Sequence, residues 1–325
     1  MASGKVARRT AVADVAEVLD SPEVATLVRE LGALRWTGRK GYGARALVGA
    51  CLVKTLFALP TWTRVAALIA EHPGLQAAIG GCPSVWALYR FTEKLRAHSD
   101  KLADCLDAVS ASLQDALPDY GVDVAIDASD MPAFANGQRY VYQGGPERER
   151  YSDPDASWGH RSAVSTRAAG SFYGFKLHLA ACARTGLPVA WRVETARRNE
   201  SLYVAPLLDA ARARGLRPET CAMDKGYDNN RVMDETRERK CVPVVCLRKG
   251  RAIPLSPIPY GTDEWKRLYR GRAAVEREFG RLKHDYALGP LRVRGLERVR
   301  LHANLVMLGR LGQALARSRA VRLAA

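Results

Sequence analysis

The hydrophobic pattern of the chain changes near Pro118, and this change constrains the fold more than any other feature. Residues 10–118 have apolar residues at helical spacing, in short segments separated by Gly, Pro and Ser, without strand alternation. Residues 121–250 instead alternate short apolar runs with helical segments. We therefore place a domain boundary near residues 118–121, with an all-α region before it and an α/β region after it.

The α/β region is predicted to form a mixed five-stranded sheet. Its apolar runs are bounded by turn-forming residues, and Arg184-Thr185-Gly186 separates two of them as in a hairpin. The expected strands are 121–129, 172–182, 187–193, 219–223 and 242–247, and the expected helices are 200–214, 228–239 and 265–286.

The all-α region is expected to contain helices at 22–32, 44–58, 63–71, 85–97 and 99–117. The helix at 85–97 allows two interpretations. It is the recognition helix of a helix-turn-helix-like module, with Arg90 and Lys94 contacting DNA. Alternatively, its large apolar residues pack the domain while the basic residues contact solvent, and we favour this interpretation. The apolar residues concerned are Trp86, Leu88, Tyr89 and Phe91. Arg39 and Lys40, in the loop before the helix at 44–58, are equally good candidates for phosphate contacts.

Two aspartates follow apolar strands. The first expected strand ends in Asp127, and the fourth is followed at once by Asp224. Carboxyl ends of strands form the edge of an α/β sheet where sites usually lie. Each residue could equally be an ordinary turn-forming aspartate, which is common after a strand.

The stretch Trp265 to Tyr286 is predicted to be one helix with two neighbouring faces. At about 100° per residue, one face is apolar and the adjacent face is polar. The apolar face consists of Leu268, Val275, Phe279 and Leu282, and the polar face of Tyr269, Arg272, Glu276 and Lys283. The polar face therefore aligns a phenol, a guanidinium, a carboxylate and an ammonium group.

These four polar residues fit the pattern Tyr-x2-Arg-x3-Glu-x6-Lys. The pattern resembles the signature of the DDE transposases of bacterial insertion sequences, in the group named after these four residues. The sequence Asp224-Lys-Gly-Tyr-Asp after a strand resembles the second-aspartate motif of the same enzymes. The resemblance covers most of residues 122–286 and implies a ribonuclease-H-like fold with Asp127, Asp224 and Glu276 as the catalytic triad.

Three carboxylates suit the chemistry that the resemblance implies. In-line cleavage of a phosphodiester needs an activated oxygen nucleophile and a stabilised leaving oxygen, which two Mg²⁺ ions can supply together. Such hard cations take oxygen ligands. We expect Asp127 to bridge the two ions and Asp224 and Glu276 to complete the two sites, with Mn²⁺ able to substitute.

The family also implies DNA contacts near the cleaved bond for Tyr269, Arg272 and Lys283. Arginine can grip a phosphate with two donors, lysine adds a compact charge, and tyrosine can bond a phosphate or stack on a base. Lys225, beside Asp224, is a further candidate. A helical N-terminal region that binds transposon ends is likewise implied.

The net charge supports a polyanionic partner. The formal charge is +16, and from Lys266 to the end of the chain 15 Lys and Arg face 4 Asp and Glu. Such a field attracts nucleic acid. The tail from 301 to 319 is expected to be a helix that is apolar on one side, with its basic residues facing outward.

Several other residues are expected to be structural. The acids in this group are Asp123, Asp130, Glu200, Asp228 and Glu278. His178 and Lys176 are interpreted as structural or DNA-facing. Trp158, in a long polar insertion, could stack on a base, but we favour a surface anchor. The segment between Asp224 and Glu276 is short, so cleavage through a DNA hairpin is left open.

Composition excludes other classes. No apolar run of 18 residues is present, so no membrane span is expected, and the N-terminus does not resemble a signal peptide. Seven scattered cysteines without a CxxC pair favour reduced thiols in a cytosol.

We therefore predict a cytoplasmic, nucleoid-associated transposase that acts on double-stranded DNA as a homo-oligomer. Its expected domains are a helical DNA-binding domain at 1–120, a catalytic domain at 121–290 and a basic helical tail at 291–325. The alternatives are a nuclease of the same fold without strand transfer, and a DNA-binding regulator whose chemistry has lapsed.

Overall fold

The computed structural model describes residues 10–34, 41–135, 153–161 and 168–324. Its contacts divide the chain into two compact units. The helical unit consists of Met1–Val109, Asp285–Ala287 and Asn304–Ala325, and the sheet unit of Ser110–His284 and Leu288–Ala303. None of the helices in the described ranges is long and apolar enough to span a membrane.

The helical unit contains two helices that the sequence pattern did not predict, α1 and α5. Thr10 caps α1 by accepting the N–H of Ala13, and the ring of His72 caps α5 by accepting the N–H of Leu75. His72-Pro73 therefore ends one helix and begins the next. The helices are α1 (Ala11–Asp20), α2 (Pro22–Ala33), α3 (Ala44–Leu56), α4 (Trp62–Glu71), α5 (Pro73–Ile79), α6 (Val85–Ala97), the start of α7 (Ser99–Ala116) and most of α12 (Leu296–Ala324).

The expected amphipathic tail is instead a long helix that is buried on most sides. From Leu301 to Ala316 nearly every residue of α12 is buried. In the helical unit, the buried carboxylate of Asp14 accepts hydrogen bonds from Gln313 at 2.6 Å and Arg317 at 2.8 Å. Glu23 forms an ion pair with Arg319 at 2.7 Å. Arg317 is exposed, as expected, although its side chain also reaches the buried carboxylate of Asp14, and the partly exposed Arg319 is paired with Glu23.

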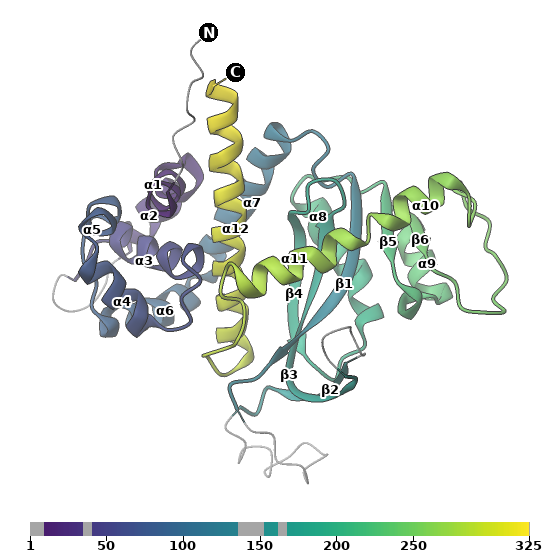
Figure 1. Ribbon diagram of the computed structural model, residues 1–325, viewed down its shortest axis with the longest axis horizontal. Coiled ribbons are helices and arrows are strands. Elements are labelled where there is room, and N and C mark those ends of the chain that lie inside the picture. Colours follow the sequence, from purple (N-terminus) through teal and green to yellow (C-terminus); the bar gives the residue numbers. More distant parts are fainter. Residues whose placement is uncertain (1–9, 35–40, 136–152, 162–167, 325) are drawn as a thin grey trace. The chain divides into compact units, whose positions relative to one another are not determined.

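A six-stranded mixed sheet forms the sheet unit (Figure 1). One edge of the central strand β3 pairs antiparallel with β1. Strand β1 also pairs parallel with β5, which in turn pairs parallel with β6. The other edge of β3 pairs first with β2 and then with β4, all antiparallel. The strands are β1 (Asp123–Pro132), β2 (Ser157–Arg161), β3 (Gly170–Cys182), β4 (Pro188–Thr195), β5 (Thr220–Met223) and β6 (Val242–Val245).

Two strands differ from the prediction. The short strand β2 lies within the polar insertion, where no strand was expected, because β3 is long enough to offer its first residues as a partner. Strand β1 continues beyond Asp127 to Pro132 for the same reason, since β3 pairs with it as far as Pro132 opposite Gly174. Asp127 therefore lies inside a strand, although it lies beyond the part of β1 that pairs with β5.

Helices cover this sheet. The turn η2 (Glu200–Tyr203) leads into α8 (Val204–Ala213), which contacts β4 and β3, while α9 (Asn230–Glu238) packs beside α8. Helix α11 (Ala273–His284) contacts β1 and β3 and runs across the sheet in Figure 1.

The stretch predicted as one helix from 265 to 286 is two helices. Helix α10 (Asp263–Arg270) ends at Gly271, and α11 begins at Ala273. Across the break the backbone forms tighter bonds to the third residue back, from Arg272 to Tyr269 and from Ala274 to Gly271. A Cβ at Gly271 would lie 3.0 Å from the Cβ of Ala183, so the glycine permits this close approach to the β3–β4 turn. The four residues of the predicted apolar face are nevertheless all buried.

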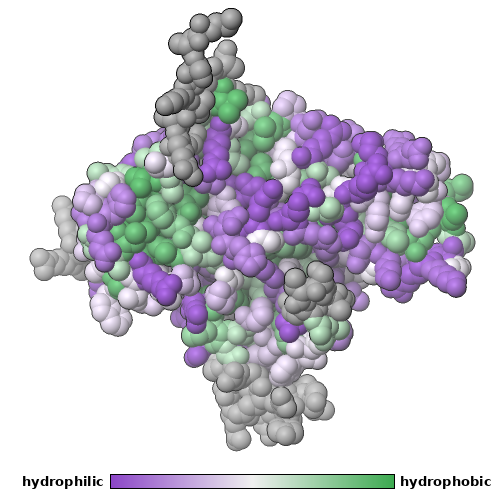
Figure 2. Space-filling model, viewed as in Figure 1, coloured by the Kyte–Doolittle hydropathy of each residue, from purple (hydrophilic) through white to green (hydrophobic). Residues whose placement is uncertain are grey.

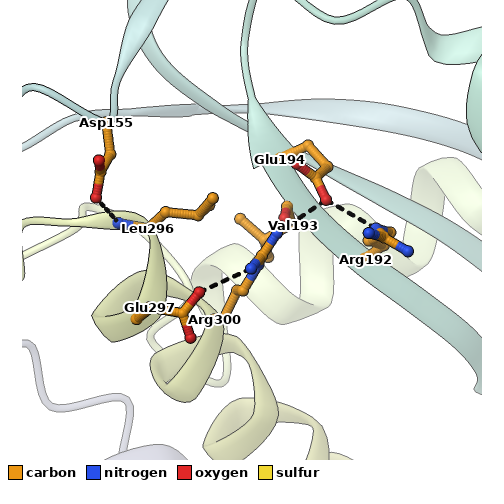
Figure 3. A network of polar contacts seen from close by, with 7 residues as sticks. All are labelled: Asp155, Arg192, Val193, Glu194, Leu296, Glu297 and Arg300. Carbon is orange, nitrogen blue, oxygen red and sulfur yellow. Dashed lines mark hydrogen bonds and ion pairs between the residues drawn. The ribbon is translucent and has the colours of Figure 1, made fainter.

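The first turns of α12 belong to the sheet unit and are tied to it by polar contacts (Figure 3). Asp155 accepts the N–H of Leu296 at 2.8 Å, near the positive end of the helix. One turn later, Arg300 donates to Glu194 of β4 at 2.9 Å. Arg300 is thus a further basic residue of the tail that has an acidic partner.

Close packing of α3 against α5 in the helical unit gives a testable stability difference. A Cβ at Gly49 would lie 2.6 Å from the Cβ of Ile79. We expect Gly49→Ala to lower the free energy of unfolding by about 1–3 kcal/mol, as overpacking does. Gly280→Ala in α11, where no atom lies within 4 Å of the added Cβ, should raise it by up to about 1 kcal/mol through helix propensity. Urea titration followed by circular dichroism measures both, and equal effects would contradict the packing.

Candidate active site

Strand register brings Asp127 and Asp224 to the same level of the sheet. Parallel pairing joins Asp123 to Thr220 and Ala125 to Ala222. Continued by two residues, the same register sets Asp127 opposite Asp224, which directly follows β5. Neighbouring strands lie about 4.8 Å apart. Asp127 and Asp224 therefore lie at the same level of the sheet, at the carboxyl end of β5.

Asp127 is in a poorly solvated position. Its side chain retains 21% of its exposure, and it accepts the N–H of Ala128 at 2.8 Å. Burial raises the pKa of Asp127 to about 7, with smaller contributions from the negative charges of Asp224 and Glu200, while Arg272 opposes the rise. A carboxyl group with this pKa holds its charge only weakly unless a cation is near.

Asp224 is fixed by the turn that follows it. Its carboxylate accepts the N–H of Gly226 at 2.7 Å and caps the short turn η3 (Lys225–Tyr227). Tyr227 is buried, and its hydroxyl has no hydrogen-bond partner among the described residues. The pKa of this phenol is raised well above its usual value by burial, and by the charges of Asp127, Glu200 and Asp224. Lys225 is exposed beside Asp224.

Arg272 links Glu276 to Asp127. Its Nη1 atom lies 2.8 Å from Oε1 of Glu276 and 3.9 Å from Oδ2 of Asp127. The two carboxylate oxygens can therefore be no further apart than these two distances added together. The Glu276 side chain is 52% exposed, so it can move from this position without leaving a core.

Tyr269 and Lys283 have protein partners of their own. The ring of Tyr269 stacks on Trp265 with centroids 4.8 Å apart, and the guanidinium of Arg272 lies 6.0 Å from its centroid. Lys283 forms an ion pair with Asp130 at 3.3 Å, and Arg161 approaches the same aspartate at 3.5 Å. Asp130, which was expected to be structural, lies within β1, where two cations neutralise its buried charge.

The family comparison is decisive. The family model described as "Transposase DDE domain" matches residues 121–310, more than half of the chain and all of Asp127, Asp224 and Glu276. The chain belongs to the DDE transposases. No curated protein and no solved structure matched it. The mixed, curled sheet with flanking helices is thus the ribonuclease-H-like fold of this transposase family, as predicted, with a helical N-terminal region before it.

Asp127, Asp224 and Glu276 are chemically suited to bind a divalent metal ion, because all three side chains are oxygen donors of the kind that Mg²⁺ prefers. As they stand, however, no three His, Cys, Asp or Glu side chains in the described ranges are close enough to bind one ion together. Glu276 instead bonds to the guanidinium of Arg272, which also lies 3.9 Å from Asp127.

A cleft that the sequence did not predict lies beside the turn η3 that follows Asp224. It has a volume of about 590 Å³, and its lining includes Trp158, Arg197, Arg198, Glu200 and Tyr227. Trp158 packs against Tyr173 yet remains 37% exposed, and both arginines are exposed. Glu200 pairs with Lys176, which also lines the cleft. No motif marks these residues, because they come from separate parts of the chain, namely β2, the segment after β4 and the turn η3.

The remaining acids and His178 have structural surroundings. Asp228 was expected to cap a helix, but Asn229 does so, and Asp228 instead accepts the N–H of Arg248 at 2.7 Å. Glu278 is buried beside Arg281, and Asp123 bonds Arg184. His178 is buried and stacked on Tyr203, so it does not face DNA.

Helix α6 of the helical unit contradicts part of the favoured packing interpretation. Leu88 and Phe91 are buried, as expected. Trp86 is 75% exposed and Tyr89 is 47% exposed, so these two rings do not pack the unit. They lie on the same exposed face as Arg90. Arg39 and Lys40 lie outside the described residues.

The raised pKa of Asp127 predicts a pH-dependent stability difference. A carboxyl group whose folded pKa lies near 7, above its ordinary 3.8, binds more protons in the folded state. Its contribution to the stability of the folded state therefore falls as the pH rises from 3.8 to about 7. Asp127→Asn lacks this dependence. In metal-free buffer we expect the variant to have a higher melting temperature than the wild type at pH 8 and a similar one at pH 4. Glu264→Asn, exposed on α10, is the control. A gain that is independent of pH would contradict the assignment.

Proposed function

We propose that this transposase binds the ends of an insertion sequence, cleaves them with a metal-dependent Asp127–Asp224–Glu276 triad, and joins the freed ends to target DNA. The observation that carries the proposal is the register that sets Asp127 level with Asp224, together with the Arg272 link from Asp127 to Glu276. The match of residues 269–283 to the Tyr-Arg-Glu-Lys pattern supports membership of that group.

The three carboxylates would hold the metal. Asp127 is the proposed bridging ligand, and Asp224 and Glu276 the ligands of one ion each. When bound, two Mg²⁺ ions, or Mn²⁺ in their place, polarise the phosphate and stabilise charge on the attacking and leaving oxygens. Burial of Asp127 then becomes useful, because a poorly solvated carboxylate gains most from a bound cation.

Both reaction steps are in-line displacements at phosphorus. In cleavage, a water oxygen forms a new bond to phosphorus, the bond to the 3′ oxygen breaks, and that oxygen leaves as a 3′-hydroxyl. In strand transfer, the 3′-hydroxyl attacks a target phosphodiester and displaces a second 3′ oxygen. Each step consumes one phosphodiester bond, and strand transfer makes another.

DNA is proposed to lie along the polar side of α10 and α11. On the face seen in Figure 2, hydrophilic residues gather over these helices. Tyr269, Arg272 and Lys283 supply contacts there, and exposed Lys225 adds a charge beside Asp224. Lys283 would exchange Asp130 for a phosphate, since Arg161 still accompanies that aspartate.

The cleft would hold the strand that flanks the cleaved bond. Arg197 and Arg198 offer charge, and the exposed ring of Trp158 offers a stacking surface. In the helical unit, Arg90 and Lys94 of α6 are the proposed contacts to the transposon end. The exposed rings of Trp86 and Tyr89 on that helix support this role. We further propose that the protein acts as a homo-oligomer on paired ends, on double-stranded DNA of the nucleoid.

Loss of any triad carboxylate should slow cleavage strongly. We expect Asp127→Asn, Asp224→Asn and Glu276→Gln to slow Mg²⁺-dependent cleavage of labelled end DNA by roughly 10²–10⁴-fold, since metal stabilisation is worth several kcal/mol. Glu264→Gln should cleave normally. Gel analysis of nicks at the element boundary, with Ca²⁺ replacing Mg²⁺ as a blank, measures the rates. Unchanged cleavage in any triad variant would refute that residue's role.

Strand transfer separates the proposal from a nuclease of the same fold. Pre-cut ends with a free 3′-hydroxyl, incubated with Mg²⁺ and a supercoiled target plasmid, should give joined products with the wild type and none with Asp127→Asn. Cleavage without joining would indicate the nuclease instead.

The cleft arginines should contribute to the salt dependence of DNA binding. We expect Arg197→Ala and Arg198→Ala each to lower the slope of log affinity against log salt by about 1, as loss of one phosphate contact does. Arg217→Ala, which precedes β5 at its other end, should leave the slope unchanged. Fluorescence anisotropy with end DNA at several salt concentrations measures the slopes, and equal slopes in all variants would remove the cleft from the DNA path.

A further inference from the structure

One guanidinium nitrogen occupies the space between two carboxylates of the triad. Nη1 of Arg272 is within hydrogen-bonding distance of Glu276 at 2.8 Å and within ion-pairing distance of Asp127 at 3.9 Å. A cation thus already neutralises these two acids in the DNA-free protein. The same two acids are needed as metal ligands in the proposed function.

A guanidinium and Mg²⁺ cannot both use this position well. Mg²⁺ requires oxygens at about 2.0–2.1 Å in near-octahedral geometry. An N–H donor on Oε1 of Glu276 occupies one of its lone pairs and adds a positive charge beside the ion. In agreement, no three potential ligands in the described part of the chain are close enough to coordinate one ion.

The position of Arg272 in the chain allows its side chain to change partner. It lies in the break between α10 and α11. The side chain is 24% exposed and the Glu276 side chain is 52% exposed, so solvent and DNA can reach the pair. A phosphodiester is a better partner than one carboxylate oxygen, because it accepts two parallel hydrogen bonds from the guanidinium fork.

We propose that Arg272 is a positioning residue that acts through Glu276. In the absence of DNA its guanidinium occupies the position between Glu276 and Asp127, and a DNA phosphate withdraws the guanidinium so that Glu276 can complete the metal site. The inference rests on the proposed function. Its consequence is that DNA and metal bind cooperatively, and that divalent metal binds poorly to the protein alone.

Linkage makes the consequence quantitative. If end DNA raises the affinity for metal by some factor, metal must raise the affinity for end DNA by the same factor. Couplings of this kind typically amount to about 5–150-fold. Removal of Arg272 should abolish most of the coupling by making the DNA-free protein already competent to bind metal.

The test measures Ca²⁺ binding to the full-length protein, by calorimetry and by the Ca²⁺-dependent shift in melting temperature. In the absence of DNA, Arg272→Gln should bind Ca²⁺ at least about tenfold more tightly than the wild type, within the usual range of such couplings. Arg277→Gln removes the same charge one residue after Glu276 on the exposed side of α11, and should match the wild type. An equal gain in both variants, or no gain in Arg272→Gln, would overturn the inference.

Wild-type protein supplies a second measurement that does not depend on the folding of a variant. Its Ca²⁺ affinity should rise on addition of pre-cut end DNA, and its end-DNA affinity should rise by the same factor on addition of Ca²⁺. Independent binding of the two ligands would overturn the inference.

A double variant distinguishes failure of this inference from failure of the proposed function. The double variant Asp127→Asn with Arg272→Gln should lose the gain in Ca²⁺ affinity, because the gain requires the triad. If the gain persists without Asp127, the metal site proposed for this transposase is wrong, and the inference falls with it. If cleavage requires the triad while Arg272→Gln leaves Ca²⁺ affinity unchanged, only the inference falls.

Discussion

The parallel pairing of β1 with β5 is the constraint on which the site depends. Three paired positions fix the register of two strands that are 97 residues apart in the chain. A slip by one residue would turn every side chain of one strand to the opposite face. Buried residues on both strands, such as Val124 and Cys221, prevent such a slip. Asp127 and Asp224 lie at the same level because the apolar residues before them are held in the sheet.

The local hydrophobic pattern predicted most of the helices and strands, because helical and strand periodicities depend only on residues close together in the sequence. It predicted the hairpin at Arg184 and the buried face of α11 for that reason. It did not predict the break at Gly271, which depends on the approach of Ala183, nor the ion pair of Lys283 with Asp130, which joins residues far apart in sequence. The exposure of Trp86 escaped prediction because a large apolar side chain is ordinarily assigned to a core.

Part of the candidate site could likewise be predicted from the sequence, and part could not. Aspartates that follow strands, and a spaced signature on a helix, could be found in the sequence because the chemistry requires particular residue types at particular places. The cleft of Trp158, Arg197 and Arg198 could not, because its residues have no fixed spacing and converge only when β2 joins the sheet. The proximity of the Glu200 charge to Asp127 was not predicted for a similar reason, since the sequence context of Glu200 is that of an ordinary turn.

The composition of the helical unit has a consequence for synthesis of the protein. The first helices of this unit are joined to α12 by polar contacts. Gln313 and Arg317 donate hydrogen bonds to the buried Asp14, and Arg319 forms an ion pair with Glu23. During translation this unit must wait for its last helix to leave the ribosome, whereas every strand of the sheet has been made by residue 245. The N-terminal helices therefore complete their packing around Asp14 only after α12 has been made.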